Sequence, residues 1–157
     1  MDIFEKITFR KLNDKDKDLF VSLRMVYLNE EFDINEKDKE KIINSLNTYY
    51  DKHNKNDFIG IIAEIDKKIV SVAYLAISEK PANPSFINGK IGTLLNVYTY
   101  PEFRKKGIAT KLIEKIIEEG KKINVSSIEL KSTEAGNKLY KNLGFTEGKH
   151  MSMSKKL

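Results

Sequence analysis

The fold is decided by residues 97–120, which read V-Y-T-Y-P-E-F-R-K-K-G-I-A-T-K-L-I-E-K-I-I-E-E-G. The first four residues are aromatic or β-branched and favour a strand, and Pro101 ends the strand because proline has no N–H to donate. After Gly107 the apolar residues recur at helical spacing, which predicts a helix. A strand therefore leads through a short basic loop into the N-terminus of a helix.

The basic loop has the properties of an anion-binding site. Arg104, Lys105 and Lys106 precede Gly107, and a helix N-terminus adds free backbone N–H groups and a positive dipole end. Three cationic side chains beside a glycine that admits close approach indicate a diphosphate. The alternative is an ordinary surface turn with solvated lysines.

Two segments resemble the signatures of the GNAT N-acetyltransferase superfamily. R-K-K-G-I-A, at residues 104–109, resembles the family's R/Q-x-x-G-x-G/A acetyl-CoA loop. L-Y-K-N-L-G-F, at residues 139–145, is similar to its L-Y-x-x-L-G-F helix end. The resemblance is strong in the C-terminal half and extends to the N-terminal half only through the order of elements. It implies an acyltransferase with acetyl-CoA as co-substrate.

Composition agrees with a soluble globular protein. With 157 residues, 40% hydrophobic and 32% charged, the chain suits one domain over residues 1–157. The absence of a long apolar run, of a signal-peptide pattern and of cysteine leads us to expect a cytoplasmic protein without membrane contact. The net charge of +5 is spread among interspersed acidic residues, so we expect no nucleic-acid partner.

The hydrophobic pattern predicts an α/β fold of the α+β mixed type. We expect a GNAT-like central sheet, mixed but mostly antiparallel, of about six strands flanked by about four helices. The expected strands are residues 7–12, 58–65, 69–78, 91–100, 127–131 and 149–155, and the expected helices are residues 15–30, 36–53, 108–120 and 135–143. The strands on either side of the long helix form a β-α-β crossover and should be parallel.

The resemblance also implies where acetyl-CoA binds. The pantetheine arm would pair along Val97, Tyr98 and Thr99 at the end of the fourth strand. The pyrophosphate would lie on the loop and helix start, formed by Arg104, Lys105, Lys106, Gly107, Ile108, Ala109 and Thr110. The asparagine that the family often carries before its last helix falls at Thr133, where the hydroxyl of Thr133 or Ser132 would make a weaker contact.

Acetyl transfer from a thioester to an amine needs an acid for the leaving thiolate and a base for the amine. Tyr140 matches the signature tyrosine and is the candidate acid, and the alternative is a tyrosine that only packs at a helix end. The fourth strand has no carboxylate. The base is therefore either one of Glu30, Glu31 and Asp33, in the bend after the first helix, or a chain of water molecules.

The expected acceptor is a primary amine of a small molecule or a peptide. Four aromatic residues of the first two helices are either walls of the acceptor pocket or core, and these are Tyr27, Phe32, Tyr49 and Tyr50. The acidic cluster at Glu30 would suit a cationic amine. His53 and His150 are isolated, and no metal site is predicted.

Two other functions share some of these sequence features. A non-catalytic acyl-CoA-binding sensor or partner module would need the loop but no base. A different nucleotide-binding domain is disfavoured because the sequence has neither G-x-x-x-x-G-K-[ST] nor G-x-G-x-x-G. Since the family is often dimeric, the resemblance also allows a homodimer.

Overall fold

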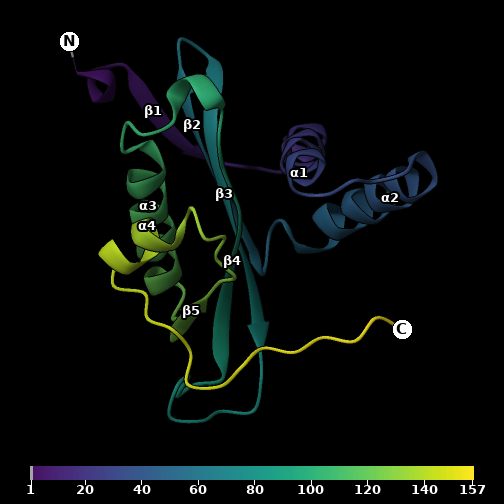
Figure 1. The fold of residues 1–157 in the computed structure, drawn as a ribbon, viewed down its shortest axis with the longest axis vertical. Coiled ribbons are helices and arrows are strands. Elements are labelled where there is room, and N and C mark those ends of the chain that lie inside the picture. Colours follow the sequence, from purple (N-terminus) through teal and green to yellow (C-terminus); the bar gives the residue numbers. More distant parts are fainter. Residues whose placement is uncertain (1) are drawn as a thin grey trace.

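The structure, a computed structural model, describes residues 2–157 and consists of one sheet between two layers of helices (Figure 1). The helices α1 and α2 lie on one side of the sheet, and α3 and α4 lie on the other. The elements are β1 (Ile7–Lys11), α1 (Lys17–Glu31), α2 (Glu36–His53), β2 (Phe58–Ile65), β3 (Lys68–Glu79), β4 (Lys90–Thr99), α3 (Ile108–Lys122), β5 (Ser127–Glu129) and α4 (Asn137–Asn142), with short 3-10 helices at Ile3–Glu5 and Pro101–Phe103.

The sheet has the order β1-β2-β3-β4-β5. Neighbours are antiparallel from β1 to β4, whereas β4 and β5, which are joined through α3, are parallel. The predicted mixed sheet and the predicted β-α-β crossover are thus confirmed. The predicted bounds of α2 and β2 agree with the structure, and those of β1, α1, β3, β4, β5, α3 and α4 differ by at most two residues at each end.

The sixth strand predicted at residues 149–155 is wrong. This segment has no strand structure, and Met151 and Met153 each have 89% of their surface exposed. Its alternation of methionine with polar residues is typical of a strand, but a strand also needs a neighbour to bond. The adjacent edge belongs to β5, which is only three residues long. The sheet therefore has five strands within residues 2–157.

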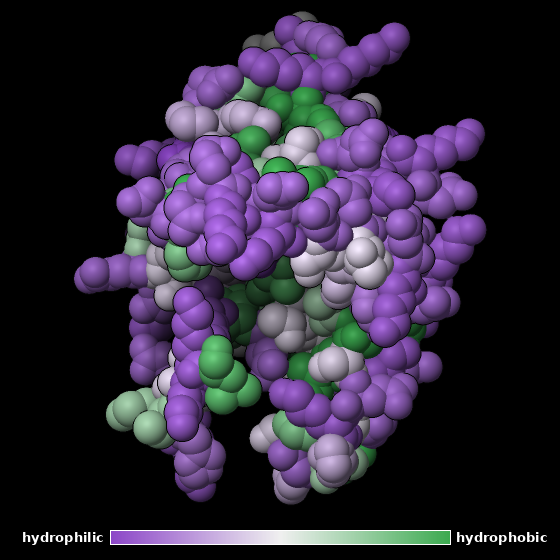
Figure 2. Space-filling model, turned by 90° about the vertical axis from the view of Figure 1, so that its right-hand side faces the viewer, coloured by the Kyte–Doolittle hydropathy of each residue, from purple (hydrophilic) through white to green (hydrophobic). Residues whose placement is uncertain are grey.

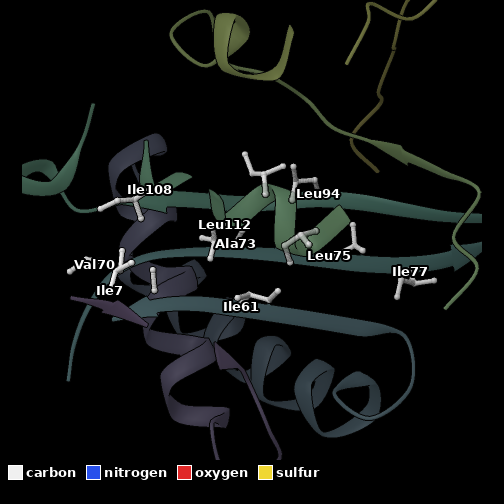
Figure 3. Close-up of a cluster of buried hydrophobic side chains, with 12 residues drawn as sticks. Ile7, Ile61, Val70, Ala73, Leu75, Ile77, Leu94, Ile108 and Leu112 are labelled. Carbon is white, nitrogen blue, oxygen red and sulfur yellow. The ribbon is translucent and has the colours of Figure 1, made fainter. Parts of the chain in front are cut away.

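The helix α3 forms the core on one face of the sheet. Its residues Ile108, Leu112, Ile113 and Ile116 are buried because the helical repeat places them on one stripe. They pack against apolar side chains of the strands, which include Ile61, Val70, Ala73, Leu75 and Leu94 (Figure 3).

The core on the opposite face is aromatic. Phe20 of α1 lies at its centre, with ring centroids 4.7 Å from Tyr50, 5.2 Å from Phe58 and 5.0 Å from Tyr74. The buried hydroxyl of Tyr74 donates a hydrogen bond to the carbonyl of Phe20, and that of Tyr50 donates to the carbonyl of Asn13. The polar ends of these rings are therefore satisfied, and α1 and α2 are fixed to the sheet.

We predict that Ile113→Ala lowers the free energy of unfolding by about 2–5 kcal/mol, because it leaves a cavity between α3 and the sheet. Denaturant unfolding followed by circular dichroism measures this change. The matched control is Ile87→Ala, at a side chain that is 78% exposed, for which we expect a change below about 0.5 kcal/mol. Similar losses at the two sites would contradict the packing of α3.

A second prediction concerns the start of α1, where Arg10 donates to both carboxylate oxygens of Asp16 at 2.8 and 3.1 Å. The hydrogen bonds from Arg10 lower the pKa of Asp16. Because the folded-state pKa lies below the unfolded value, the stabilisation is present above the unfolded pKa and is lost as the pH falls through the folded one.

Asp16→Asn should therefore remove about 1 kcal/mol at pH 7, a modest amount because solvent screens the pair, and should flatten the acid limb of the stability curve. Unfolding midpoints between pH 2 and pH 7 measure this effect. Asp33→Asn, at an exposed aspartate between α1 and α2, is the control and should retain the wild-type slope. An unchanged acid limb in Asp16→Asn would refute the prediction.

Candidate active site

The site begins where β4 separates from β5. Only Ile91–Thr93 of β4 pair with β5, so from Leu94 onward this side of β4 has no strand neighbour within residues 2–157. On its other side β4 stays paired with β3, but the register shifts at a β-bulge that contains Asn96. Asn96 is buried and has a φ of 55°, a left-handed conformation that asparagine tolerates better than most residues. The bulge and the divergence together open the sheet at this point.

A cleft of about 720 Å³ lies at this opening. It is lined by α1, by β4, by the segment after β5, by α4 and by the C-terminal segment, with Arg24, Tyr27, Asn96, Ser132 and Tyr140 among its walls. On the face of the molecule that carries α1 and α2, the hydrophilic surface is interrupted by a central hollow with a hydrophobic floor (Figure 2). The cleft can therefore hold a ligand that is partly apolar.

The basic loop after β4 is shaped to present backbone N–H groups. Lys105 and Gly107 have φ values of 60° and 79°, and Gly107 caps α3 in a left-handed conformation. The first α-helical hydrogen bond runs from Lys111 N–H to the carbonyl of Gly107. The N–H groups of Ile108, Ala109 and Thr110 consequently have no helical acceptor and remain available to an anion.

Two of the three cations of the loop are engaged within the chain. Arg104 donates to both carboxylate oxygens of Glu30 at 2.9 and 3.1 Å and to the carbonyl of Thr99 at 2.8 Å. The hydrogen bonds from Arg104 lower the pKa of Glu30. Lys106 donates to the carbonyl of Glu102 at 3.0 Å. The backbone, with Lys105, therefore provides more of the anion-binding capacity than the sequence indicates.

The end of β4 offers backbone groups rather than side chains. Val97 packs against the α3-side core, and Tyr98 is buried on the α1 side, where burial and a hydrogen bond with Glu30 raise its pKa. The hydroxyl of Thr99 lies 2.8 Å from that of Ser71. These side chains belong to the sheet, so a ligand along this segment would meet the unpaired edge of the strand.

Tyr140 of α4 lies in the wall of the cleft. Burial, and to a lesser extent the nearby hydroxyl of Tyr27, raises the pKa of Tyr140. Its phenol is protonated at neutral pH, as that of an ordinary tyrosine is, and can donate a proton. Its ring packs edge-on against Phe145 at 5.8 Å. Leu139, Leu143 and Phe145 pack against the α3-side core.

The segment before α4 differs from the expectation based on sequence. The hydroxyl of Thr133 accepts a hydrogen bond from the N–H of Gly136 at 3.2 Å and so holds the turn. Ser132 lines the cleft instead, as does Asn137, one turn further along, which sequence reasoning missed. At the position of the family's asparagine this chain has Thr133, and the side chain of Asn137 offers a nearby polar group to a ligand in the cleft.

The three carboxylates proposed as bases do not line the cleft. Glu30 is bound by Arg104, and Glu31 and Asp33 are exposed. The carboxylates that do line it are Glu129, whose nearest cation is Lys80 at 3.8 Å, and Glu147, which lies 3.5 Å from Lys141. Neither lies in a recognisable motif, so the sequence alone gave no signal for them.

The four aromatic candidates for the acceptor pocket fall into two groups. Tyr27 and Phe32 line the cleft, whereas Tyr49 and Tyr50 pack in the aromatic core.

The two histidines lie far from each other in the sequence and have different surroundings. Nδ1 of His53 lies 2.6 Å from a carboxylate oxygen of Asp57, and His150 lines the cleft. Across residues 2–157, no three His, Cys, Asp or Glu side chains form a group that could hold a metal ion. Nor does that range contain a helix long and apolar enough to cross a membrane.

An open sheet, a helix N-terminus after its fourth strand and a half-buried tyrosine in one cleft are features of an acyltransferase fold and site. Residues 21–145 match the model of the acetyltransferase (GNAT) family. The chain therefore belongs to this family of acyltransferases, whose enzymes use acetyl-CoA as co-substrate. No curated protein matches the sequence.

Solved structures agree with this assignment. A predicted acetyltransferase with acetyl-CoA from Clostridium acetobutylicum is 29% identical with a TM-score of 0.84, and the match covers 95% of this chain and 96% of that one. A GCN5-related N-acetyltransferase from Ralstonia eutropha JMP134 is 22% identical with a TM-score of 0.81, over 95% and 98% of the two chains. Glucosamine-6-phosphate N-acetyltransferase from Arabidopsis thaliana is 21% identical with a TM-score of 0.69, over 96% and 97%. The last two likenesses show a common fold.

Proposed function

We propose that the protein is a single-domain N-acetyltransferase that transfers an acetyl group from acetyl-CoA to a primary amine of a small molecule or peptide. The amine attacks directly, within a ternary complex. The observation that carries this proposal is the free edge of β4 beyond Thr93, which runs from the cleft that holds Tyr140 to the loop at residues 104–109.

The chemistry of acetyl-CoA fits these parts of the chain. The pantetheine arm has two amides, and the unpaired edge of β4 at Val97, Tyr98 and Thr99 offers the backbone donors and acceptors that such amides need. The pyrophosphate needs several donors close together, which the N–H groups at the start of α3 and the positive-φ residues Lys105 and Gly107 supply.

Each group then has a defined part in the reaction. The amine nitrogen bonds to the carbonyl carbon of the thioester, and the carbon–sulfur bond breaks. The sulfur leaves as a thiolate and takes the proton of Tyr140, which solvent later replaces. The attacking nitrogen loses its proton to water in the cleft. Glu30 is held by Arg104, Glu31 and Asp33 lie outside the cleft, and Glu129 and Glu147 have lysine partners.

Two observations favour this function over a non-catalytic acyl-CoA-binding module. The match to the acetyltransferase family supports an enzyme, and Tyr140 places a phenol, which is protonated at neutral pH, in the wall of the cleft. A nitrogen acceptor is supported by the names of the structural neighbours from Ralstonia and Arabidopsis, both of which are N-acetyltransferases.

We predict that Gly107→Asp weakens acetyl-CoA binding about 100-fold or more, because it adds a negative charge to the loop proposed to hold the pyrophosphate. The matched variant is Gly107→Asn, which has the same size and also tolerates a φ of 79° but carries no charge. Calorimetric titration with acetyl-CoA should show a much smaller loss for asparagine, and both variants should unfold at similar temperatures. Equal affinities for the two variants would place the phosphates elsewhere.

We predict that Tyr140→Phe lowers kcat about 100-fold and leaves the affinity for acetyl-CoA within twofold of wild type, since the phenol acts on the leaving thiolate. Release of free CoA reports kcat. The control is Tyr49→Phe, in the aromatic core outside the cleft, which should retain the wild-type rate.

The pH profile gives an independent check of Tyr140. Because its pKa is raised, the acid form persists above pH 10, the ordinary tyrosine value, and the rate should show no basic limb below that pH. A tyrosine limb below pH 10, or a wild-type rate in Tyr140→Phe, would remove Tyr140 as the acid.

A further inference from the structure

The chain contains only three arginines among its 28 basic residues. Two of them hold a carboxylate within the chain through paired hydrogen bonds, Arg10 with Asp16 and Arg104 with Glu30. The third, Arg24 of α1, has no ion pair in the part of the chain that the structure describes. Yet Arg24 is the one whose guanidinium lies in the wall of the cleft.

The surroundings of Arg24 are polar but uncharged. Its guanidinium lies 5.7 Å from the ring of Tyr27 and donates one long hydrogen bond, of 3.4 Å, to the side-chain oxygen of Asn96. The titratable groups that act on it are the hydroxyls of Tyr27, Tyr74 and Tyr49. The carboxylates elsewhere in the cleft, Glu129 and Glu147, have lysine neighbours of their own.

The remaining donors of Arg24 are not buried within the protein, so a ligand in the cleft can reach them. Arg24 is half-buried, and burial lowers its pKa, although a guanidinium remains charged at any physiological pH. A guanidinium has five N–H donors in a planar fork, and among residues 2–157 Arg24 uses one of them. For a solvated charge this chain mostly uses lysine, whereas its other two arginines each bind a carboxylate. The fork of arginine matches the two oxygens of a carboxylate or phosphate.

The position of Arg24 associates it with the acceptor. Asn96, which bonds to it, forms the bulge at which β4 leaves the sheet, and Tyr27 lies close enough to Tyr140 to affect its pKa. Arg24 therefore lies on the α1 wall of the same cleft, opposite the side formed by α4. The cationic acceptor predicted from the acidic cluster loses its main support, since Glu30 is neutralised by Arg104.

We propose that Arg24 is a specificity residue that binds an oxyanion, a carboxylate or a phosphate monoester, carried by the amine acceptor. The acceptor class is then an amine with an anionic group, such as an amino acid or an amino phosphate. This inference rests on the proposed transferase function, because it places the acceptor in the same cleft.

The first experiment observes the arginine directly and needs no knowledge of the acceptor. With only three arginines, the Nε–H resonances of ¹⁵N-labelled protein can be assigned through Arg10→Lys, Arg24→Lys and Arg104→Lys. The CoA-bound protein is titrated with sodium acetate and, separately, with inorganic phosphate, each against sodium chloride at equal ionic strength.

We expect the Arg24 resonance to shift saturably with acetate or with phosphate, and the anion with the lower apparent Kd identifies the preferred group. The resonances of Arg10 and Arg104 are internal controls, since both are already paired with carboxylates. A response of Arg24 that does not exceed the chloride control with either anion would overturn the proposal.

The second experiment uses matched amines. Each amino acid is compared with its amide, and phosphoethanolamine is compared with ethanolamine, by the release of free CoA. Arg24→Gln keeps a donor for Asn96 but removes the charge, and should lower kcat/KM for the anionic member of a pair about 30-fold or more, mainly through KM. The neutral member should change less than twofold, and Arg24→Lys should recover part of the loss.

An equal loss for both members of a pair would overturn the proposal, because it would make Arg24 a support of the β4 bulge or of the reacting carbonyl. Failure of the transferase function is recognised separately, by calorimetric titration of the same samples with acetyl-CoA. If acetyl-CoA does not bind, the proposed function fails, whereas a silent Arg24 in a protein that binds acetyl-CoA contradicts only the acceptor class.

Discussion

The site depends on one constraint, which is that β4 must keep its hydrogen bonds to β3 while it parts from β5 after three residues. A regular strand would continue to pair on both sides and would close the sheet. The bulge at Asn96 changes the direction of β4 at the point where the partner strand ends. The cost of a buried asparagine in a left-handed conformation is offset by hydrogen bonds to the carbonyl of Leu23 and from Arg24, both on α1. The opening in the sheet is therefore held by α1, which also forms one wall of the cleft.

The same strand also fixes the loop that follows it. The Arg104 side chain bridges the carbonyl of Thr99 and the carboxylate of Glu30, and so connects the end of β4, the basic loop and the end of α1. Arg104, which the sequence motif associates with phosphate binding, therefore also stabilises the fold. Since α1 contributes Arg24 and Tyr27 to the cleft and Glu30 to the pair with Arg104, contacts of one helix set the positions of a cleft wall and of the loop.

Sequence alone predicts what depends on local pattern. The change of period at Gly107 located the strand, loop and helix. It did not predict what depends on partners distant in the chain. Glu30 and Arg104 are 74 residues apart, and nothing near either one indicates that they pair. Residues 149–155 alternate as a strand does, but no neighbouring strand pairs with them. Tyr49 and Tyr50 are of a residue type that often lines ligand pockets, but they pack into the aromatic core. Arg24 was missed because one arginine between apolar residues looks like a residue at the edge of a helix stripe.

The two cores on opposite faces of the sheet also differ in the order in which the ribosome makes them. The buried members of the aromatic core lie within residues 20–98, so this face can close once β4 has emerged. The other face needs Ile108, Leu112, Ile113 and Ile116, and until α3 is synthesised it exposes the strand residues that α3 later covers, including Val70 and Leu75. A nascent chain that pauses between β4 and α3 therefore has one face of the sheet covered by α1 and α2 and the other apolar face exposed. Chaperones bind exposed apolar surfaces of this kind, and aggregation starts from them.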